Sequence, residues 1–231
     1  MKWFLGIIPY IDLKRPLFYT NFSDFSKNDR SLYFPGKRDG KGKMEAYEDP
    51  KNRARILGSG RRAEWLKVDE LIEKAGVSQG MVCVDLGSGA GAVSLPLVEK
   101  VGSTGQVYAV DTNPNVLQVI KEKSPPTNLV ILQKSAADTG IDASIADCCF
   151  MILVLHEIPP EGVLAEAYRL LKTGGKAIAL EWRMDFESPR PPLNERIDRD
   201  HMEQLMADAG FTEFEYTRWS DSHYVMMAVK R

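Results

Sequence analysis

Residues 82–91 read Val-Cys-Val-Asp-Leu-Gly-Ser-Gly-Ala-Gly, and this stretch decides the fold class. Its first half is a short, nearly continuous apolar run, which is typical of a strand buried on both faces of a sheet. Its second half carries Gly87, Gly89 and Gly91, which allow the backbone to approach a ligand closely. Because open α/β sheets bind ligands beyond the carboxyl ends of their strands, we expect a ligand-binding loop here.

Apolar runs and helical patterns alternate outward from this loop. Four further strands are predicted, at residues 106–111, 129–133, 148–155 and 176–181. Five helices are predicted, at residues 61–76, 93–101, 113–123, 160–171 and 199–209. Strands that alternate with helices favour right-handed βαβ crossovers, so we expect an α/β fold with a parallel, doubly wound sheet. Residues 211–219 and 224–230 predict an antiparallel hairpin at the sheet edge, with His223 as a turn residue.

The composition of the 231-residue chain is that of a globular protein, with 44% hydrophobic and 27% charged residues. The formal net charge is -2, so no global positive field exists to gather nucleic acid. No apolar run approaches the roughly 20 residues that span a bilayer. The three cysteines, two of them adjacent at 148–149, form neither a disulfide framework nor a CxxC metal spacing. We therefore expect a cytoplasmic protein without a transmembrane segment, a metal or a nucleic-acid partner.

The first 43 residues differ from the rest of the chain in charge and composition. They hold nine Lys or Arg and four Asp, a net charge of about +5, against about -7 for residues 44–231. Nine aromatic residues fall within the first 34 positions. We interpret residues 1–43 as a basic aromatic extension and residues 44–231 as the domain. Three interpretations of the extension stay open: an arm packed on the domain, a membrane-surface or partner contact, or a stretch upstream of a true start at Met44.

The glycine loop by itself leaves the cofactor open between two nucleotide types. Gly87, Gly89 and Ala92 satisfy the relaxed dinucleotide fingerprint GxGxxG/A. Asp111 lies 24 residues beyond Gly87, where a carboxylate can hold the ribose of NAD or of another nucleoside. An NAD(P)-dependent Rossmann oxidoreductase is therefore one alternative.

Four motifs in a fixed order break this tie. They are DLGSGAG at 85–91, AVD at 109–111, LHEI at 155–158 and LKTGG at 171–175. In this order and at these intervals, about residues 44–231 resemble the class I S-adenosylmethionine-dependent methyltransferases, especially the small-molecule ubiquinone/menaquinone-biosynthesis type. The resemblance implies a seven-stranded, mostly parallel sheet of strand order 3-2-1-4-5-7-6 with an antiparallel C-terminal hairpin. It also implies S-adenosyl-L-methionine as the cofactor and in-line methyl transfer to a small-molecule acceptor.

The resemblance further implies which residues bind the cofactor. Asp85 would engage the methionine amino group directly or through water, and Asp111 would accept hydrogen bonds from both ribose hydroxyls. Ser135 stands where the family usually offers an acidic residue to the adenine, a departure for which the nearby Asp138 is a substitute. The other implied contacts are Gly87, Ser88, Gly89 and Gly91 in the loop, Thr112 and Asn113 under the adenine, Ala136, and Leu155 beside the sulfonium.

Residues after the fourth and fifth strands are the candidates for chemistry on the acceptor. His156, Glu157 and Glu181 are the catalytic candidates, and a general base is needed only for an acceptor that is protonated at working pH. A proline-rich insertion at residues 189–193 would bring Arg190 and Arg196 near an anionic acceptor. The predicted substrate-pocket residues are Tyr47, Trp182, Arg183, Arg190 and Tyr224.

Other activities are weighed against this interpretation. A thiol-rich metalloid site at Cys148 and Cys149 is rejected, because adjacent side chains on a strand point to opposite faces. A non-catalytic S-adenosylmethionine-binding module that acts on a partner through residues 1–43 stays open beside the oxidoreductase. The acceptor atom, whether carbon, nitrogen, oxygen or sulfur, and the oligomeric state also stay open.

Overall fold

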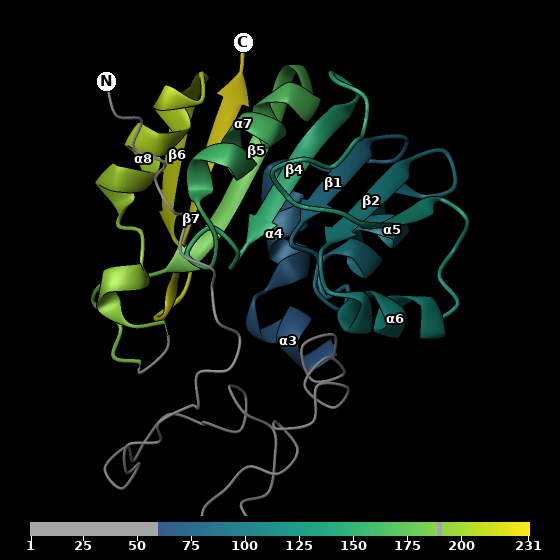
Figure 1. Cartoon of the computed structure of the whole chain (residues 1–231), viewed down its shortest axis with the longest axis horizontal. Coiled ribbons are helices and arrows are strands. Elements are labelled where there is room, and N and C mark those ends of the chain that lie inside the picture. The colour runs from purple at the N-terminus through teal and green to yellow at the C-terminus, as the bar shows by residue number, and fades with distance from the viewer. Residues whose placement is uncertain (1–59, 189–190) are drawn as a thin grey trace, which may run out of the picture. The chain divides into compact units, whose positions relative to one another are not determined.

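Strand β1, formed by the first half of residues 82–91, is the third strand of a seven-stranded sheet. The computed structural model describes residues 60–188 and 191–231, and Figure 1 shows how their helices and strands are arranged. The strand order is β3-β2-β1-β4-β5-β7-β6, which confirms the predicted order. The strands are β1 Val82–Leu86, β2 Gln106–Asp111, β3 Leu129–Gln133, β4 Ala146–Ile152, β5 Leu171–Trp182, β6 Phe211–Arg218 and β7 His223–Lys230.

The direction of the strands brings the candidate residues to one edge of the sheet. Strands β1 to β5 pair in parallel, so their carboxyl ends meet at the lower edge in Figure 1. Strand β7 pairs antiparallel with both β5 and β6. Its first residue, His223, therefore lies opposite Trp182, the last residue of β5. The loops that follow β1, β2, β4 and β5 and the start of β7 thus share one edge.

Helices cover both faces of this sheet. Buried residues of α4, α5 and α6 share one hydrophobic cluster with the sheet, and those of α7 and α8 share the other. Cys148 belongs to the first cluster and Cys149 to the second, so the two thiols face opposite sides of β4 as predicted. The helices are α3 Gly60–Trp65, α4 Val68–Ala75, α5 Ser94–Val101, α6 Pro114–Glu122, α7 Pro160–Leu170 and α8 Arg199–Asp208, with a 3-10 turn η1 at Leu193–Glu195.

The predicted single helix over residues 61–76 is wrong, because the chain forms two helices there. Lys67, between α3 and α4, has a φ of 53°, in the left-handed region. Its neighbours Leu66 and Val68 are each 1% exposed and belong to the same cluster. Residues two apart on a continuous helix point about 200° from one another. The break therefore allows both side chains to enter the core.

Two predicted strands also differ in length from those observed. The fourth was expected to continue to residue 155 but ends at Ile152, because Leu153 turns the chain with a φ of 56°. The fifth was expected from residue 176 but begins at Leu171, which pairs with Ala146 before a register shift in β4. The early end of β4 leaves residues 153–156 at the carboxyl edge, outside the ladder.

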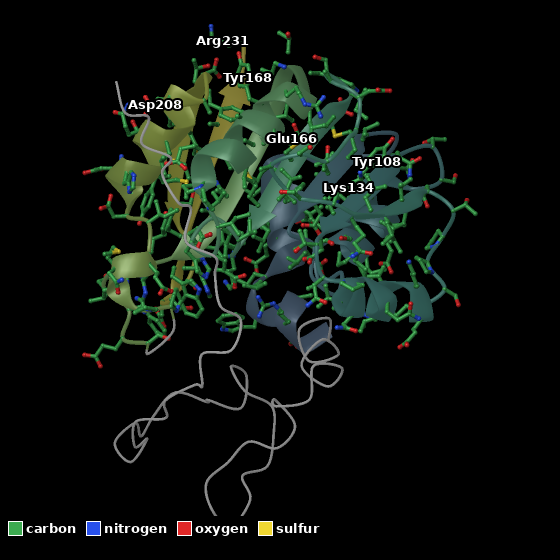
Figure 2. The ribbon with its side chains drawn as sticks, viewed as in Figure 1. Tyr108, Lys134, Glu166, Tyr168, Asp208 and Arg231 are labelled. Atoms are coloured by element: carbon green, nitrogen blue, oxygen red, sulfur yellow. The ribbon has the colours of Figure 1, made fainter. Side chains whose placement is uncertain are left out.

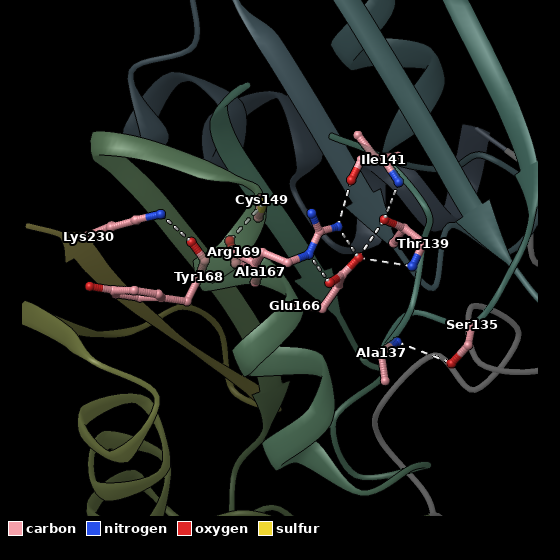
Figure 3. A network of polar contacts seen from close by, with 10 residues as sticks. All are labelled: Ser135, Ala137, Thr139, Ile141, Cys149, Glu166, Ala167, Tyr168, Arg169 and Lys230. Atoms are coloured by element: carbon pink, nitrogen blue, oxygen red, sulfur yellow. Dashed lines mark hydrogen bonds and ion pairs between the residues drawn. The ribbon is translucent and has the colours of Figure 1, made fainter. Parts of the chain in front are cut away.

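A polar network ties the opposite edge of the sheet together. Glu166 of α7 accepts hydrogen bonds from the backbone and the hydroxyl of Thr139 and from Arg169, which also donates to the carbonyl of Ile141 (Figure 3). Lys230 at the end of β7 donates to the carbonyl of Tyr168 at 2.8 Å. Figure 2 shows Glu166 and Tyr168 at the upper end of the molecule, away from α3. This network is structural and lies away from the candidate site.

Some predictions fall on residues outside the described part of the chain. These are the extension at residues 1–43, Met44, and the pocket candidates Tyr47 and Arg190. Among residues 60–188 and 191–231, no helix has the length and apolar character that a membrane crossing requires.

Candidate active site

The glycine loop after β1 is held against strand β2 and the segment that follows β4. The backbone N–H groups of Gly87 and Ser88 both donate to the carbonyl of Val110 in β2, each at 2.9 Å. Gly87 has a φ of 78°, and a Cβ there would lie 2.6 Å from Cγ2 of Val154. A side chain at position 87 would therefore displace the segment that follows β4. The loop and that segment form one packed unit.

Asp111, at the end of β2, presents its carboxylate to the same loop. Its Oδ2 accepts from the N–H of Gly89 at 2.9 Å, and its Oδ1 accepts from the N–H of Asn113 at 2.8 Å. An ionised carboxylate has about four acceptor positions, so each oxygen retains capacity for a ligand donor. Asp111 is partly exposed, which leaves this capacity accessible. The carboxylate is thus fixed by the backbone and open to a diol.

Two features of the loop fit the cofactor implied by the resemblance. A Cβ at Gly89 would meet nothing within 4 Å, so there is free space above the loop at this point. Ser88 is 7% exposed, and its Oγ has no hydrogen-bond partner among the described residues. A buried polar atom without a partner requires an explanation, and a bound ligand provides one. Together with Asp111, these residues fit a nucleoside joined to an amino acid.

Asp85 is buried beneath the loop at the end of β1. It is 1% exposed, and its Oδ2 accepts from the hydroxyl of Ser94, the first residue of α5, at 2.5 Å. Burial raises the pKa of Asp85 to about 7, against the hydrogen bond from Ser94, and the charge of Asp111 adds to the rise. Its contact with the methionine amino group stays a prediction.

The residues predicted around the adenine lie where β2 and β3 end. Thr112 and Asn113 are exposed after β2, and the Asn113 side chain caps α6 by accepting from the N–H of Asn115 at 3.0 Å. Ser135 is exposed, and its hydroxyl accepts from the N–H of Ala137 at 3.2 Å, a contact drawn in Figure 3. Ala136 is buried. Their roles toward a cofactor stay predictions.

His156 and Glu181 form a hydrogen-bonded pair at the carboxyl ends of β4 and β5. The Nδ1 of His156 lies 2.6 Å from Oε2 of Glu181, whose Oε1 accepts from the N–H of Leu155 at 2.9 Å. Glu181 is fully buried, and the His156 side chain is 7% exposed. Because a carboxylate only accepts, Nδ1 carries the proton and the lone pair lies on Nε2. The pair thus has the geometry of a base held by a carboxylate.

The surroundings of His156 raise its pKa above the ordinary 6.5. Burial alone would lower it, but the hydrogen bond and the charge of Glu181 outweigh burial, and Glu157 and Glu195 add to the rise. Glu157 is largely exposed, with Oε1 4.0 Å from Nε2 of His156. Nε2 of His156, the nitrogen that carries the lone pair, therefore lies on the same side as the exposed carboxylate of Glu157.

The two described arginines expected near the acceptor are tied to the backbone. Arg196 is 6% exposed and donates to the carbonyls of Arg183, Phe186, Ser188 and Pro191, so its predicted role as an anion ligand is wrong. These bonds use four of the five N–H donors of its guanidinium.

The guanidinium of Arg183 donates to Asp185 and, at 3.0 Å, to the carbonyl of Ser220. It thus links the end of β5 to the β6–β7 turn. The Tyr224 hydroxyl donates to the carbonyl of Ile197 at 2.7 Å, and burial raises the pKa of this phenol above its usual range. Contact of Arg183, Tyr224 or the buried Trp182 with an acceptor stays a prediction.

His223 is placed by the structure differently from its prediction. We expected a turn residue, but it is the first residue of β7, is 0% exposed, and contacts Trp65 and Trp182 with ring centroids 4.6 and 4.5 Å away. Its position beside Trp182 follows from the β5–β7 register, which local sequence patterns do not reveal. In the described part of the chain, no group of three or more His, Cys, Asp or Glu side chains is arranged to hold a metal ion.

Comparison with known proteins identifies the enzyme class. A family described as "Methyltransferase domain" matches residues 84–179. A ubiquinone/menaquinone biosynthesis C-methyltransferase from Shewanella pealeana is 26% identical over 189 residues, which cover 65% of this chain and 74% of that protein. A 2-phytyl-1,4-naphtoquinone methyltransferase from Trichormus variabilis is 31% identical over 139 residues, 58% of either chain.

The fold is shared with a crystal structure of an S-adenosylmethionine-dependent methyltransferase from Aquifex aeolicus. The TM-score is 0.72 at 22% identity, over 79% of this chain and 100% of that one. The family match includes the glycine loop and Asp111, which decides between the two cofactors that the loop alone left open. The cofactor is S-adenosylmethionine rather than a nicotinamide, and the chain is a class I S-adenosylmethionine-dependent methyltransferase with distant homologues among the quinone-biosynthesis enzymes.

Proposed function

We propose that this methyltransferase acts on a small-molecule acceptor that gives up a proton, and that His156 receives this proton. The observation that carries the proposal is the hydrogen-bonded pair of His156 and Glu181 at the carboxyl edge of the sheet. An acceptor that carries no proton at the reacting atom needs no base, so the pair favours a protonated oxygen, nitrogen or acidic carbon.

The geometry of the pair suits a base. Glu181 holds Nδ1–H of the imidazole with one oxygen and the N–H of Leu155 with the other, which fixes both the ring and the backbone beside it. The proton from the acceptor goes to Nε2, and the imidazolium that forms is stabilised by the buried carboxylate. Glu181 is thus a positioning residue.

The cofactor side asks little covalent chemistry of the protein. S-adenosylmethionine, when bound, supplies an electrophilic methyl group on a sulfonium. Asp111 and the glycine loop would hold the nucleoside, and Leu155 lies next to His156 at the same edge. Alignment of the two reactants can contribute several kcal/mol, about 7–11 kcal/mol in the most favourable intramolecular cases.

Charge and surface character support a small molecule as the acceptor. Residues 44–231 carry a net charge of about -7, which opposes binding to a nucleic-acid backbone. Of the four exposed large apolar side chains in the described residues, Ile158, Met184 and Leu193 follow β4 or β5. The names of the two relatives given above assign them to quinone-pathway compounds. These names agree with a small apolar acceptor.

The test is a turnover assay with His156→Gln. S-adenosylhomocysteine release is measured across a panel of phenols, enols, amines and thiols, with His201→Gln as the matched control on the exposed first turn of α8. We expect kcat/KM for the best acceptor to fall about 10²–10³-fold in His156→Gln and to stay unchanged in the control.

Two results would contradict the proposal. One is a His156→Gln enzyme as active as the unaltered chain at every pH. The other is cofactor binding without turnover on any acceptor in the panel, which would favour the non-catalytic binding module.

A further inference from the structure

Helix α5, which follows the glycine loop, begins without a capping group of its own. Val93, the residue before it, makes no capping hydrogen bond through its side chain, and the first turn of this helix holds no acidic residue. Helix starts are normally stabilised by a polar side chain or by a negative charge nearby. Asp85, near the end of β1, supplies such a group from a distance. Its Oδ2 accepts from the hydroxyl of Ser94, the first residue of α5, at 2.5 Å.

The side chain of Asp85 points into the layer of helices. Successive residues of a strand face opposite sides of the sheet. Cys83 packs in the cluster that contains α4, α5 and α6, whereas Val84 and Leu86 pack in the cluster that contains α7 and α8. Asp85 therefore faces α5. Asp85 and Ser94 are 1% and 0% exposed, so their hydrogen bond is closed off between the sheet and the helix.

Backbone hydrogen bonds tie the start of α5 to the glycine loop. The N–H of Leu95 donates to the carbonyl of Gly91 at 3.2 Å, and the N–H of Gly91 donates to the carbonyl of Ser88 at 3.0 Å. Ser88 carries the buried hydroxyl that has no hydrogen-bond partner among the described residues. A displacement of the first turn of α5 would therefore move the loop and this hydroxyl with it.

Asp85 differs from Asp111 in what it offers a ligand. Asp111 is partly exposed, so a ligand reaches its remaining acceptor positions. Burial raises the pKa of Asp85 to about 7, against the hydrogen bonds from the hydroxyl and backbone of Ser94, and the charge of Asp111 adds to the rise. At pH 7 about half of the Asp85 carboxyl groups are therefore protonated. A cationic amino group pairs best with a carboxylate that is both ionised and accessible.

We infer that Asp85 is a positioning residue of the cofactor site: through Ser94 it fixes the first turn of α5, and with it the glycine loop, and it makes no direct bond to the cofactor amino group. The family resemblance implied a contact with that amino group, so the inference gives the same side chain a different role. Asp85 then supports any ligand that uses the loop, with or without an amino group. The inference is independent of the function proposed for His156, because it concerns the cofactor alone.

The test compares S-adenosylhomocysteine with its deaminated analogue, in which a hydrogen atom replaces the amino group. Calorimetry measures the affinity of both ligands for the full chain and for Asp85→Ala, Ser94→Ala and the double variant. We expect each single change to weaken both ligands by the same factor, about tenfold, the contribution of one hydrogen bond. The double variant should bind no more weakly than Asp85→Ala, because the two residues act through one contact. Ser103→Ala, at an exposed position after α5, is the matched control.

Asp85→Asn is the conservative variant, because its amide oxygen can still accept from Ser94. We expect it to bind both ligands within about threefold of the unaltered chain. An ion pair with the amino group would instead be lost in this variant, and only S-adenosylhomocysteine would bind more weakly. Affinity is measured at a temperature where every variant is folded. A merely structural role would lower the unfolding temperature and leave this affinity unchanged.

A second measurement needs no variant. Calorimetry in buffers of different ionisation enthalpy counts the protons released when each ligand binds to the unaltered chain at pH 7. An ion pair with the amino group would ionise Asp85 completely, and S-adenosylhomocysteine alone would release about half a proton, since the pKa of Asp85 is about 7. We expect the same proton count for both ligands.

Four results would overturn the inference. They are an affinity loss in Asp85→Ala that is confined to S-adenosylhomocysteine, additive losses in the double variant, full affinity for both ligands in Asp85→Ala, and a proton count that differs between the two ligands. Each leaves the role of His156 untouched, since turnover tests that role.

Discussion

The cofactor half and the acceptor half of the edge are built in different ways. At the ends of β1 and β2, backbone N–H groups hold one partly exposed carboxylate, Asp111, which keeps acceptor capacity for a ligand. At the ends of β4, β5 and β7, buried side chains bind one another first, as in His156 with Glu181 and His223 with two serines. The first half is a local loop, whereas the second is assembled from segments distant in the sequence. We therefore expect changes around the proposed acceptor site to reduce turnover and to leave cofactor binding intact.

The largest effect is expected from Glu181→Gln. A glutamine has one oxygen for two donors, so it either releases the N–H of Leu155 or turns its NH₂ toward His156 and leaves the proton on Nε2. We expect kcat/KM to fall about 10³-fold, less than the roughly 10⁴-fold loss in kcat when the carboxylate of a catalytic triad is neutralised. Affinity for S-adenosylhomocysteine, measured by calorimetry, should stay unchanged. Equal losses in S-adenosylhomocysteine affinity and in turnover would contradict the distinction between the two halves.

The pH profile sharpens the same prediction. His156 acts as a base only when neutral, so kcat/KM of the unaltered enzyme should rise with pH through its pKa, which lies above the ordinary 6.5. Removal of the negative charge at Glu181 removes the main cause of that rise. The residual activity of Glu181→Gln should therefore reach its plateau at lower pH. A merely structural role for Glu181 would leave the inflection where it is.

The next largest effect is expected from Asp111→Ala. The change removes both acceptor oxygens from a bound diol and leaves the N–H groups of Gly89 and Asn113 without a partner. We expect about 100-fold weaker binding of S-adenosylhomocysteine, since hydrogen bonds to charged groups contribute about 1.5–3 kcal/mol each. Asp142→Ala, at an exposed position, is the control. Unchanged affinity in Asp111→Ala would refute this account of the cofactor site.

Glu166→Gln tests a region outside both halves. Glu166 is 6% exposed and accepts from Thr139 and Arg169, so we expect the free energy of unfolding in urea to fall by about 2 kcal/mol. Burial raises the pKa of Glu166, but these hydrogen bonds outweigh burial and lower it. The stabilisation is therefore present above pH 4.5 and lost as pH falls through the lowered pKa. Turnover and cofactor affinity should not change, and a loss of either would link this network to the edge.

The smallest effect is expected from Gly89→Ala. The added Cβ meets no protein atom within 4 Å, but the φ of 53° disfavours alanine. We therefore expect the free energy of unfolding to fall by only about 1 kcal/mol. The methyl group would occupy the space above the loop, and we expect S-adenosylhomocysteine to bind about tenfold more weakly. Gly87→Ala is the contrasting variant, because its Cβ would lie 2.6 Å from Val154. That variant should lose stability more than affinity.

The features that local sequence patterns predict are those that depend on neighbouring residues in the chain. Apolar runs and glycines predicted the strands and the loop between β1 and α5. The order of the motifs predicted the sheet and the cofactor, and the strand order and the family match confirm both. The break at Lys67 was missed because its cause is the burial of Leu66 and Val68 against the sheet. The spacing of apolar residues along a helix does not reveal this packing against the sheet.

The proposed acceptor half depends on contacts that form only in the folded chain. Glu181 meets His156 because β4 and β5 are parallel neighbours, and His223 meets Trp182 because β7 runs antiparallel beside β5. Arg196 points inward, where its guanidinium donates to four backbone carbonyls of the surrounding chain. The burial of these side chains, the histidine tautomers and the hydrogen-bond partners depend on residues that are close in space and far apart in the chain.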